Sequence, residues 1–234
     1  MQIFLDASDV DIIKHHYQTG LIDGVTTNPT LMKQAGRNPV EVISEISSLF
    51  NSDASISAEV VADSAKDMII QAEQYHSISK NVTIKVPCTY EGLKACKELS
   101  DKGIKVNVTL IFSLSQSILA AKAGATYISP FVGRCEDNNI DGIELISSIK
   151  KVFELNSISK TNILAASIRS INHIFDSFEA GADIVSVHPE AKDDTEACLN
   201  KIKSLNIKAG LAINPDTEWE VVKPFMDKLD LILV

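Results

Sequence analysis

The sequence lacks the short motifs that identify most cofactor and metal sites. It contains neither a GxGxxG run nor a GxxxxGK[ST] loop, so no dinucleotide site and no nucleotide-phosphate loop is predicted. Its cysteines show no CxxC spacing and no Cys/His spacing typical of a metal site; they are Cys88, Cys96, Cys135 and Cys198. We therefore expect reduced cytosolic thiols and no metal ligands among them.

The sequence also lacks an excess of positive charge and a long apolar run. Its formal net charge of -9 argues against a surface that binds nucleic acid or an anionic membrane. No apolar run approaches the roughly 18 residues of a membrane span. The first residues, Met1–Asp6, lack the basic and long apolar segments of a signal peptide. With 45% hydrophobic and 23% charged residues, the composition is typical of a soluble globular protein, which we expect in the cytoplasm.

Short apolar strands alternate with helical segments along nearly the whole chain. Helix starts are indicated by Ser8 with Asp11, by Asn38 before Pro39, and by Ser113 with Gln116. Glycine follows several helical segments, where a left-handed turn would return the chain to the sheet; these are Gly20, Gly103, Gly124 and Gly181. The predicted strands are Gln2–Asp6, Gly24–Thr27, Ser55–Val60, Val82–Val86, Lys105–Leu110, Thr126–Phe131, Asn162–Ser167 and Asp183–Val187.

This alternation predicts an α/β protein with a closed parallel (β/α)8 TIM barrel, since each of the eight units is about 25 residues long. An open doubly wound sheet is the alternative. The absence of a glycine-rich phosphate loop after the first strand weakens that alternative.

The C-terminal part of the chain adds β/α elements that an eight-stranded barrel does not need. We assign residues 1–190 to the barrel and residues 191–234 to a βα segment that packs on the barrel or completes it. An unpaired last strand would be an aggregation-prone edge, which pairing with the strand before it or with another chain would cover. The predicted elements are a helix at Ala191–Asn206, a strand at Lys208–Ile213, a helix at Asp216–Met226 and a strand at Leu229–Val234.

The strand predicted at Val82–Val86 contains a lysine, a residue type that is rarely buried in a core strand. Lys85 stands where a core strand would carry valine or isoleucine, and Pro87 is expected to stop the strand at Val86. A lysine buried away from water has a lowered pKa and a nucleophilic amine that can form a Schiff base with a carbonyl. The alternative is an edge strand with Lys85 facing water.

Polar and charged residues stand near the ends of seven predicted strands. In a parallel barrel these ends meet at one face, where function is found. The residues are Asp6, Thr26, Asn28, Glu59, Lys85, Asn107, Thr109, Ser129, Arg134, Ser167 and Arg169.

These residues suggest carbon–carbon bond cleavage through an imine on Lys85. Asp6 or Glu59 could act as the base, and Arg134, Ser167 and Arg169 could hold a phosphate. The alternatives are structural. Asp6 could cap the first helix, Asn28 could cap the helix that Pro29 starts, and Glu59 could simply pair with Lys85. Either arginine alone could be a surface or ion-pair residue.

Several runs of residues resemble the small transaldolases, class I aldolase barrels that include the fructose-6-phosphate aldolases. The resemblance extends from Met1 to about Val185. It implies Lys85 as the Schiff-base lysine, Asp6 as the acid/base at the cleaved bond, and Glu59 as acting through a water. The matching runs are Phe4–Asp6, Gly24–Leu31, Ile84–Pro87, Asn107–Leu110, Ser129–Arg134 and Ala166–Arg169.

The resemblance further implies that Thr26, Asn28, Asn107, Thr109, Ser129 and Phe131 line the sugar and that Arg134, Ser167 and Arg169 hold its phosphate. Fructose-6-phosphate aldolases carry Tyr and Gln where this chain has Phe131 and Glu59, so the pattern is that of the transferases. We therefore expect transfer of a dihydroxyacetone unit from a ketose phosphate, such as fructose 6-phosphate or sedoheptulose 7-phosphate, to an aldose phosphate. Free aldolase activity is the alternative.

The same resemblance implies no metal and no organic cofactor. It implies a cytoplasmic enzyme of the pentose phosphate pathway, with sugar phosphates as its partners and no contact with nucleic acid or membrane. Family members form homo-oligomers, rings of five or ten subunits. The segments Val187–Ala191, Lys208–Pro215 and Leu229–Val234 resemble instead the middle of ribulose-phosphate 3-epimerase. If this epimerase-like C-terminal segment disrupts the site, the chain would be a catalytically silent fusion barrel that only binds sugar phosphate.

Overall fold

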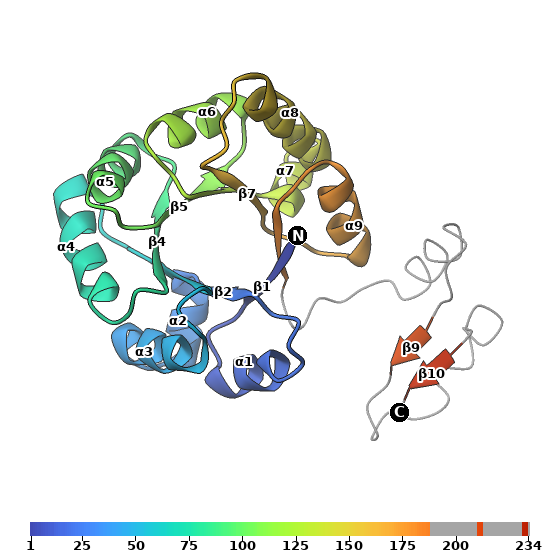
Figure 1. The fold of residues 1–234 in the computed structure, drawn as a ribbon, viewed down its shortest axis with the longest axis horizontal. Coiled ribbons are helices and arrows are strands. Elements are labelled where there is room, and N and C mark those ends of the chain that lie inside the picture. The colour runs from blue at the N-terminus through green and yellow to red at the C-terminus, as the bar shows by residue number, and fades with distance from the viewer. Residues whose placement is uncertain (188–209, 213–230, 234) are drawn as a thin grey trace. The chain divides into compact units, whose positions relative to one another are not determined.

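The computed structural model describes residues 1–187, 210–212 and 231–233. Within them, eight parallel strands close into a barrel in the order β1 to β8, and helices surround it (Figure 1). The predicted (β/α)8 barrel is confirmed, and the open sheet is excluded because β8 pairs with β1. The strands are β1 Gln2–Asp6, β2 Gly24–Thr26, β3 Ser55–Glu59, β4 Val82–Pro87, β5 Val106–Ile111, β6 Tyr127–Pro130, β7 Asn162–Ala165 and β8 Ile184–Val187.

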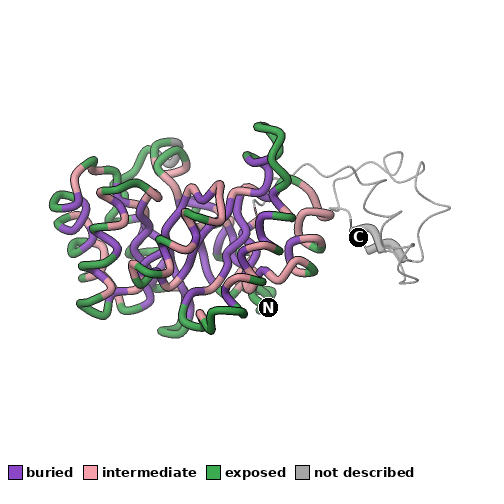
Figure 2. Tube along the Cα trace, turned by 90° about the horizontal axis from the view of Figure 1, so that it is seen from above, coloured by how far each residue is buried: buried purple, intermediate pink, exposed green. Residues whose placement is uncertain are grey.

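The helices of the described part pack outside the strands, so the strands are buried and the outer helix faces are exposed (Figure 2). None of these helices has the length and the apolar character that crossing a membrane would need. The helices are α1 Val10–Tyr17, α2 Pro29–Ala35, α3 Pro39–Leu49, α4 Ala65–His76, α5 Tyr90–Asp101, α6 Leu114–Lys122, α7 Val132–Asp137, α8 Gly142–Leu155 and α9 Ile171–Glu179.

Most of the predicted helix boundaries are confirmed by local hydrogen bonds. Asn38 and Ser113 cap α3 and α6 by accepting from Val40 N and Gln116 N. The four glycines predicted at helix ends all have positive φ, between 72° and 99°, which is the left-handed conformation that glycine adopts at little cost.

Several predicted strands differ from the observed ones by one or two residues at their ends, and two boundary predictions that relied on a particular residue, Ser8 and Pro87, are wrong. Asp9, not Ser8, caps α1 and accepts from Asp11 N and Ile12 N, while the Ser8 hydroxyl donates to Leu31 O. Strand β4 continues through Pro87, which pairs in register with Thr109. Pro87 is tolerated there because the next ladder bond comes from Cys88 N, which donates to Thr109 O.

Two apolar clusters form the core of the barrel. The large one lies between the strands and the helices and includes Ile56, Val86 and Ile149. The small one consists of Phe4, Tyr127, Leu164, Ala166 and Ile184, with Phe131 packed against it. The small cluster is the one that reaches the site described below.

The chain divides into two compact units, of which the second holds Ser170–Asn172 and residues 192–234. In that unit β9 (Gly210–Ala212) and β10 (Leu231–Leu233) pair in parallel, with Ile232 opposite Leu211. Of the two ways considered to cover the last strand, the structure shows pairing with the strand before it. The helices predicted at Ala191–Asn206 and Asp216–Met226 lie outside the described residues, and the packing predicted for residues 191–234 stays a prediction.

Candidate active site

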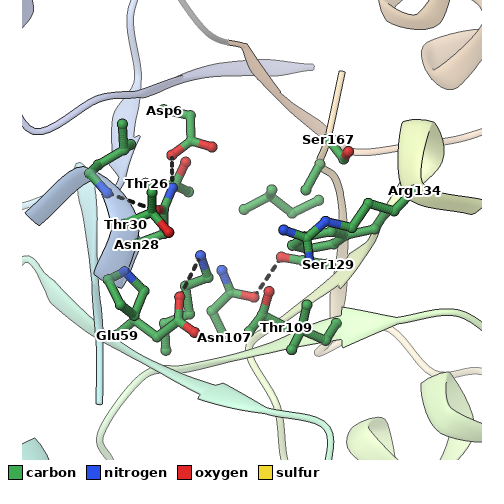
Figure 3. A pocket seen from close by; sticks show the side chains of 17 residues that line it. Asp6, Thr26, Asn28, Thr30, Glu59, Asn107, Thr109, Ser129, Arg134 and Ser167 are labelled. Carbon is green, nitrogen blue, oxygen red and sulfur yellow. Dashed lines mark hydrogen bonds and ion pairs between the residues drawn. The ribbon is translucent and has the colours of Figure 1, made fainter. Parts of the chain in front are cut away.

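A cavity of about 420 Å³ opens at the carboxyl ends of the barrel strands (Figure 3). Every residue predicted for the site lines it, with the single exception of Arg169. The lining residues are Asp6, Thr26, Asn28, Pro29, Thr30, Leu31, Glu59, Lys85, Asn107, Thr109, Leu110, Ser129, Phe131, Arg134, Leu164, Ala166 and Ser167.

Lys85 lies on β4, between β3 and β5, and points into the barrel. Strand register places it opposite Glu59 on one side and Asn107 on the other. It is 6% exposed, and its Nζ lies 3.0 Å from Glu59 Oε2 and donates to Thr27 O at 3.0 Å. The alternative of an edge strand with Lys85 facing water is therefore wrong.

The Lys85–Glu59 pair fits both interpretations of Glu59. The two side chains are 7% and 14% exposed, so each charge neutralises the other in a largely dry position. Both side chains also line the cavity, where a bound molecule can reach them. The ion pair thus stabilises the buried charges and places a carboxylate within proton-transfer range of the amine.

Asp6 and Asn28 meet on the opposite side of the cavity mouth from Ser129 and Arg134 (Figure 3). The Asn28 amide donates to Asp6 Oδ1 at 3.5 Å, and its oxygen accepts from Leu31 N at 3.0 Å. Asn28 is thus the predicted cap of α2 as well as a cavity residue. Asp6 does not cap α1, because Asp9 does, so the helix-cap alternative for Asp6 is wrong.

Hydroxyl and amide groups form the polar floor of the cavity. Thr26 Oγ1 and Ser186 Oγ are 2.5 Å apart, and Ser129 Oγ donates to Asn107 Oδ1 at 2.8 Å. Among the described residues, Asn107 Nδ2 and Thr109 Oγ1 have no hydrogen-bond partner although both are fully buried. Unpaired buried polar groups are costly, so these two atoms are suited to bind a polar ligand.

Arg134 and Ser167 lie at the rim of the cavity on the side opposite Asp6 and Asn28 (Figure 3). Arg134 on α7 places its guanidinium carbon 5.2 Å from the centre of the Phe131 ring. Ser167 has a φ of 58° and its carbonyl accepts from Gly133 N at 3.0 Å, which ties the segment after β7 to the start of α7.

The Arg169 side chain does not line the cavity and pairs instead with Asp137. Its two terminal nitrogens donate to the two carboxylate oxygens of Asp137, both at 2.6 Å. This forked bond holds the pKa of Asp137 below its usual value and raises the pKa of Arg169, although both side chains are about half exposed. Arg169 therefore does not line the cavity in the described part of the chain, and its contact with a phosphate stays a prediction.

The structure also adds residues that sequence reasoning missed. Leu110, Leu164 and Ala166 contribute an apolar wall, Thr30 and Leu31 come from the first turn of α2, and Ser186 supports Thr26. Apolar residues in strands are expected in the core, so nothing in the sequence pattern distinguished them. Among the described residues, no group of three or more His, Cys, Asp or Glu side chains could hold a metal ion.

The sequence matches the protein family described as Transaldolase/Fructose-6-phosphate aldolase over residues 3–217. The match continues well past Val185, where the resemblance of the motifs ends. The likeness of the tail to an epimerase stays a prediction.

Curated relatives show the same likeness. A probable transaldolase of Ruegeria pomeroyi is 47% identical over 218 residues, covering 89% of this chain and 99% of the relative. A probable transaldolase of Paracoccus denitrificans is 51% identical over 189 residues, covering 81% of this chain and 86% of the relative.

Among solved structures, the thiamine phosphate pyrophosphorylase of Pyrococcus furiosus superimposes with a TM-score of 0.56. The alignment covers 80% of this chain and 85% of that protein, at 14% identity. A likeness at this identity concerns the fold alone.

Proposed function

Because the chain belongs to the transaldolase/fructose-6-phosphate aldolase family, we propose that it transfers a dihydroxyacetone unit between sugar phosphates through a Schiff base on Lys85. The chain is an enzyme of the transaldolase type. The proposed donor is fructose 6-phosphate or sedoheptulose 7-phosphate, and the proposed acceptor is an aldose phosphate. The observation that carries the proposal is the buried Lys85 amine, 3.0 Å from Glu59 in a cavity open to a ligand.

The first step of the proposed reaction uses Lys85 and Glu59. The amine must lose a proton before it attacks the ketone carbon, and the Glu59 carboxylate is within reach to accept one. The resulting carbinolamine loses its hydroxyl as water, for which Glu59 returns the proton. The product is an iminium ion on Lys85, which can accept the electron pair of the neighbouring carbon–carbon bond.

Asp6 would act in the second step. Its carboxylate takes the proton of the hydroxyl at carbon 4, the bond between carbons 3 and 4 breaks, and the aldose phosphate leaves. The electron pair moves into the iminium to form a three-carbon enamine on Lys85. When an acceptor aldehyde enters, the enamine carbon adds to it, Asp6 returns the proton to the new hydroxyl, and hydrolysis releases the product.

The polar floor and the rim would orient the sugar. Asn107 Nδ2 and Thr109 Oγ1, which have no partner among the described residues, can bind hydroxyl groups of the three-carbon unit. Arg134 and Ser167 can bind the phosphate at the rim. Arg169 could bind the phosphate with a second guanidinium only if its two hydrogen bonds to Asp137 were broken or if it bound Asp137 and the phosphate together.

Free aldolase activity is the second candidate, and the side chain at position 131 favours transfer. Phe131 lines the cavity and has no hydroxyl that could protonate the enamine. We expect Phe131→Tyr to raise the release of free dihydroxyacetone in the absence of acceptor and to lower transfer. The assay compares the two products from the same ketose phosphate.

Phe112→Tyr is the matched control for that substitution. The Phe112 and Phe131 rings pack edge to face, 6.0 Å apart, and only Phe131 is among the described residues that line the cavity. The control enzyme should keep the wild-type product ratio. Unchanged release of dihydroxyacetone by Phe131→Tyr would show that the role assigned to Phe131 is wrong.

Borohydride trapping tests the proposed chemistry directly. The protein is incubated with fructose 6-phosphate, the imine is reduced, and the peptides are mapped by mass spectrometry. A three-carbon adduct is expected on Lys85 and not on the exposed Lys94 and Lys97, which serve as internal controls for random modification. An unmodified Lys85 in folded protein would reject the proposal and favour a barrel that only binds sugar phosphate.

A further inference from the structure

Leu110 has a backbone conformation that its residue type disfavours. Its φ is 61°, in the left-handed region where a side chain beyond Cβ is strained. The other non-glycine residues of the described part with positive φ are Asn139, Ser157 and Ser167, all small and polar. Strained residues of this kind gather at functional sites, and Leu110 lines the cavity.

A bulge in β5 explains how Leu110 reaches the cavity. Val108 pairs with Ile128 and Ile111 pairs with Pro130, so β5 advances three residues while β6 advances two. In a regular strand, neighbouring side chains point to opposite faces. Here Thr109 and Leu110 both line the cavity, while Val108 and Ile111 belong to the outer core. The strain at Leu110 thus accompanies an added apolar side chain in the site.

Leu110 belongs to an apolar wall of the cavity that lies across the barrel from Asp6. Strand β5 is four strands away from β1 in either direction around the barrel, so Leu110 lies across from Asp6. Strands β5 and β7 contribute Leu110 and Leu164, and Phe131 and Ala166 directly follow β6 and β7. The charged Asp6, Glu59 and Lys85 come from β1, β3 and β4.

We infer that Leu110 determines the reaction specificity of this site by keeping water from one face of the enamine. This inference rests on the proposed transfer mechanism. The acceptor aldehyde must approach the enamine carbon from the side of Asp6, because Asp6 protonates the new hydroxyl. The other face then lies against Leu110 and Phe131, which offer no hydrogen bond that could hold a water molecule.

The reaction that this wall prevents is the release of dihydroxyacetone. Water would give a proton to the enamine carbon, a new C–H bond would form, and the electron pair of the enamine would be used in that bond. The iminium that results adds water, and the carbon–nitrogen bond breaks to release dihydroxyacetone and the free Lys85 amine. The three-carbon unit is then lost before an acceptor arrives.

The test is the substitution Leu110→Asn. Asparagine tolerates a positive φ better than most residues, so the bulge should persist, and its amide can hold water at the wall. We expect the ratio of free dihydroxyacetone to transfer product to rise several-fold. In heavy water, the released dihydroxyacetone should carry one deuterium on carbon, which identifies enamine protonation as its source.

Two further variants distinguish the effect of the Leu110 side chain on the product ratio from the effect of relieving backbone strain. Leu110→Gly accepts the same φ and removes the side chain, so it should also raise the ratio. Ser157→Gly relieves a positive φ at an exposed position that does not line the cavity, and should keep the wild-type ratio. An unchanged ratio in both Leu110 variants, or an equal rise in Ser157→Gly, would overturn the inference.

Failure of the proposed function would look different from failure of this inference. If wild-type protein forms no Lys85 adduct and no transfer product, the mechanism on which the inference rests is wrong. If wild type transfers normally and both Leu110 variants keep its product ratio, the mechanism stands and the role of Leu110 is wrong.

Discussion

Lys85→Met should lose dihydroxyacetone transfer by at least about 1,000-fold, because methionine retains the length of the side chain without its amine. Without an imine there is no acceptor for the electron pair of the breaking carbon–carbon bond. The measurement is release of aldose phosphate from fructose 6-phosphate in the presence of an acceptor aldose phosphate, together with borohydride trapping, which should leave no three-carbon adduct on the protein.

The control for this substitution must address folding, since Lys85 and Glu59 form a buried ion pair. Removing one partner of such a pair costs about 3–5 kcal/mol. The double variant Lys85→Met with Glu59→Gln removes both charges, and should regain most of the lost thermal stability while it stays inactive. Lys97→Met removes an exposed lysine that pairs with Asp101, and should keep full activity. Substantial transfer by folded Lys85→Met would contradict the Schiff-base mechanism.

Asp6→Asn should lower the rate of carbon–carbon cleavage by about 10² to 10⁴, the usual contribution of a general acid/base. The substituted amide can still accept a hydrogen bond from Asn28, so the local structure should be kept. Imine formation uses Lys85 and Glu59 and should continue. Trapping with fructose 6-phosphate should therefore yield a six-carbon adduct, because the ketose binds and is not cleaved.

The size of the trapped adduct distinguishes the proposed role of Asp6 from a purely structural one. A structural loss would remove both the six-carbon and the three-carbon adducts from Lys85. Asp11→Asn is the matched control, since Asp11 is in the first turn of α1, outside the residues that line the cavity in the described structure. Normal cleavage by Asp6→Asn would show that another group is the base.

Much of the barrel could be predicted from sequence because its signals are local. Apolar strands, capping residues such as Asn38 and Ser113, and glycines after helices each act over a few neighbouring residues. The position of a polar residue near the end of a strand is also local information. In a parallel barrel all such ends meet at one face, so the lining of the cavity followed from the strand boundaries.

Side-chain partners were less predictable, because they depend on residues far apart in the chain. Arg169 is an arginine that follows the end of a strand, as expected of a residue that binds a phosphate at this face. In the structure it pairs instead with Asp137, 32 residues earlier. Thr26 meets Ser186, 160 residues later, only because β8 closes on β1 and brings the two hydroxyls together. No periodicity within one segment reports such a contact.

By itself, the sequence determined the alternation of strands and helices and the residue types near the strand ends, because hydrophobic periodicity and capping are short-range properties. Only the tertiary structure decided that Lys85 points into the cavity and pairs with Glu59, since that depends on the register between β3 and β4. It alone decided that Leu110 joins the apolar wall, because a bulge between β5 and β6 changes the side to which a strand residue points.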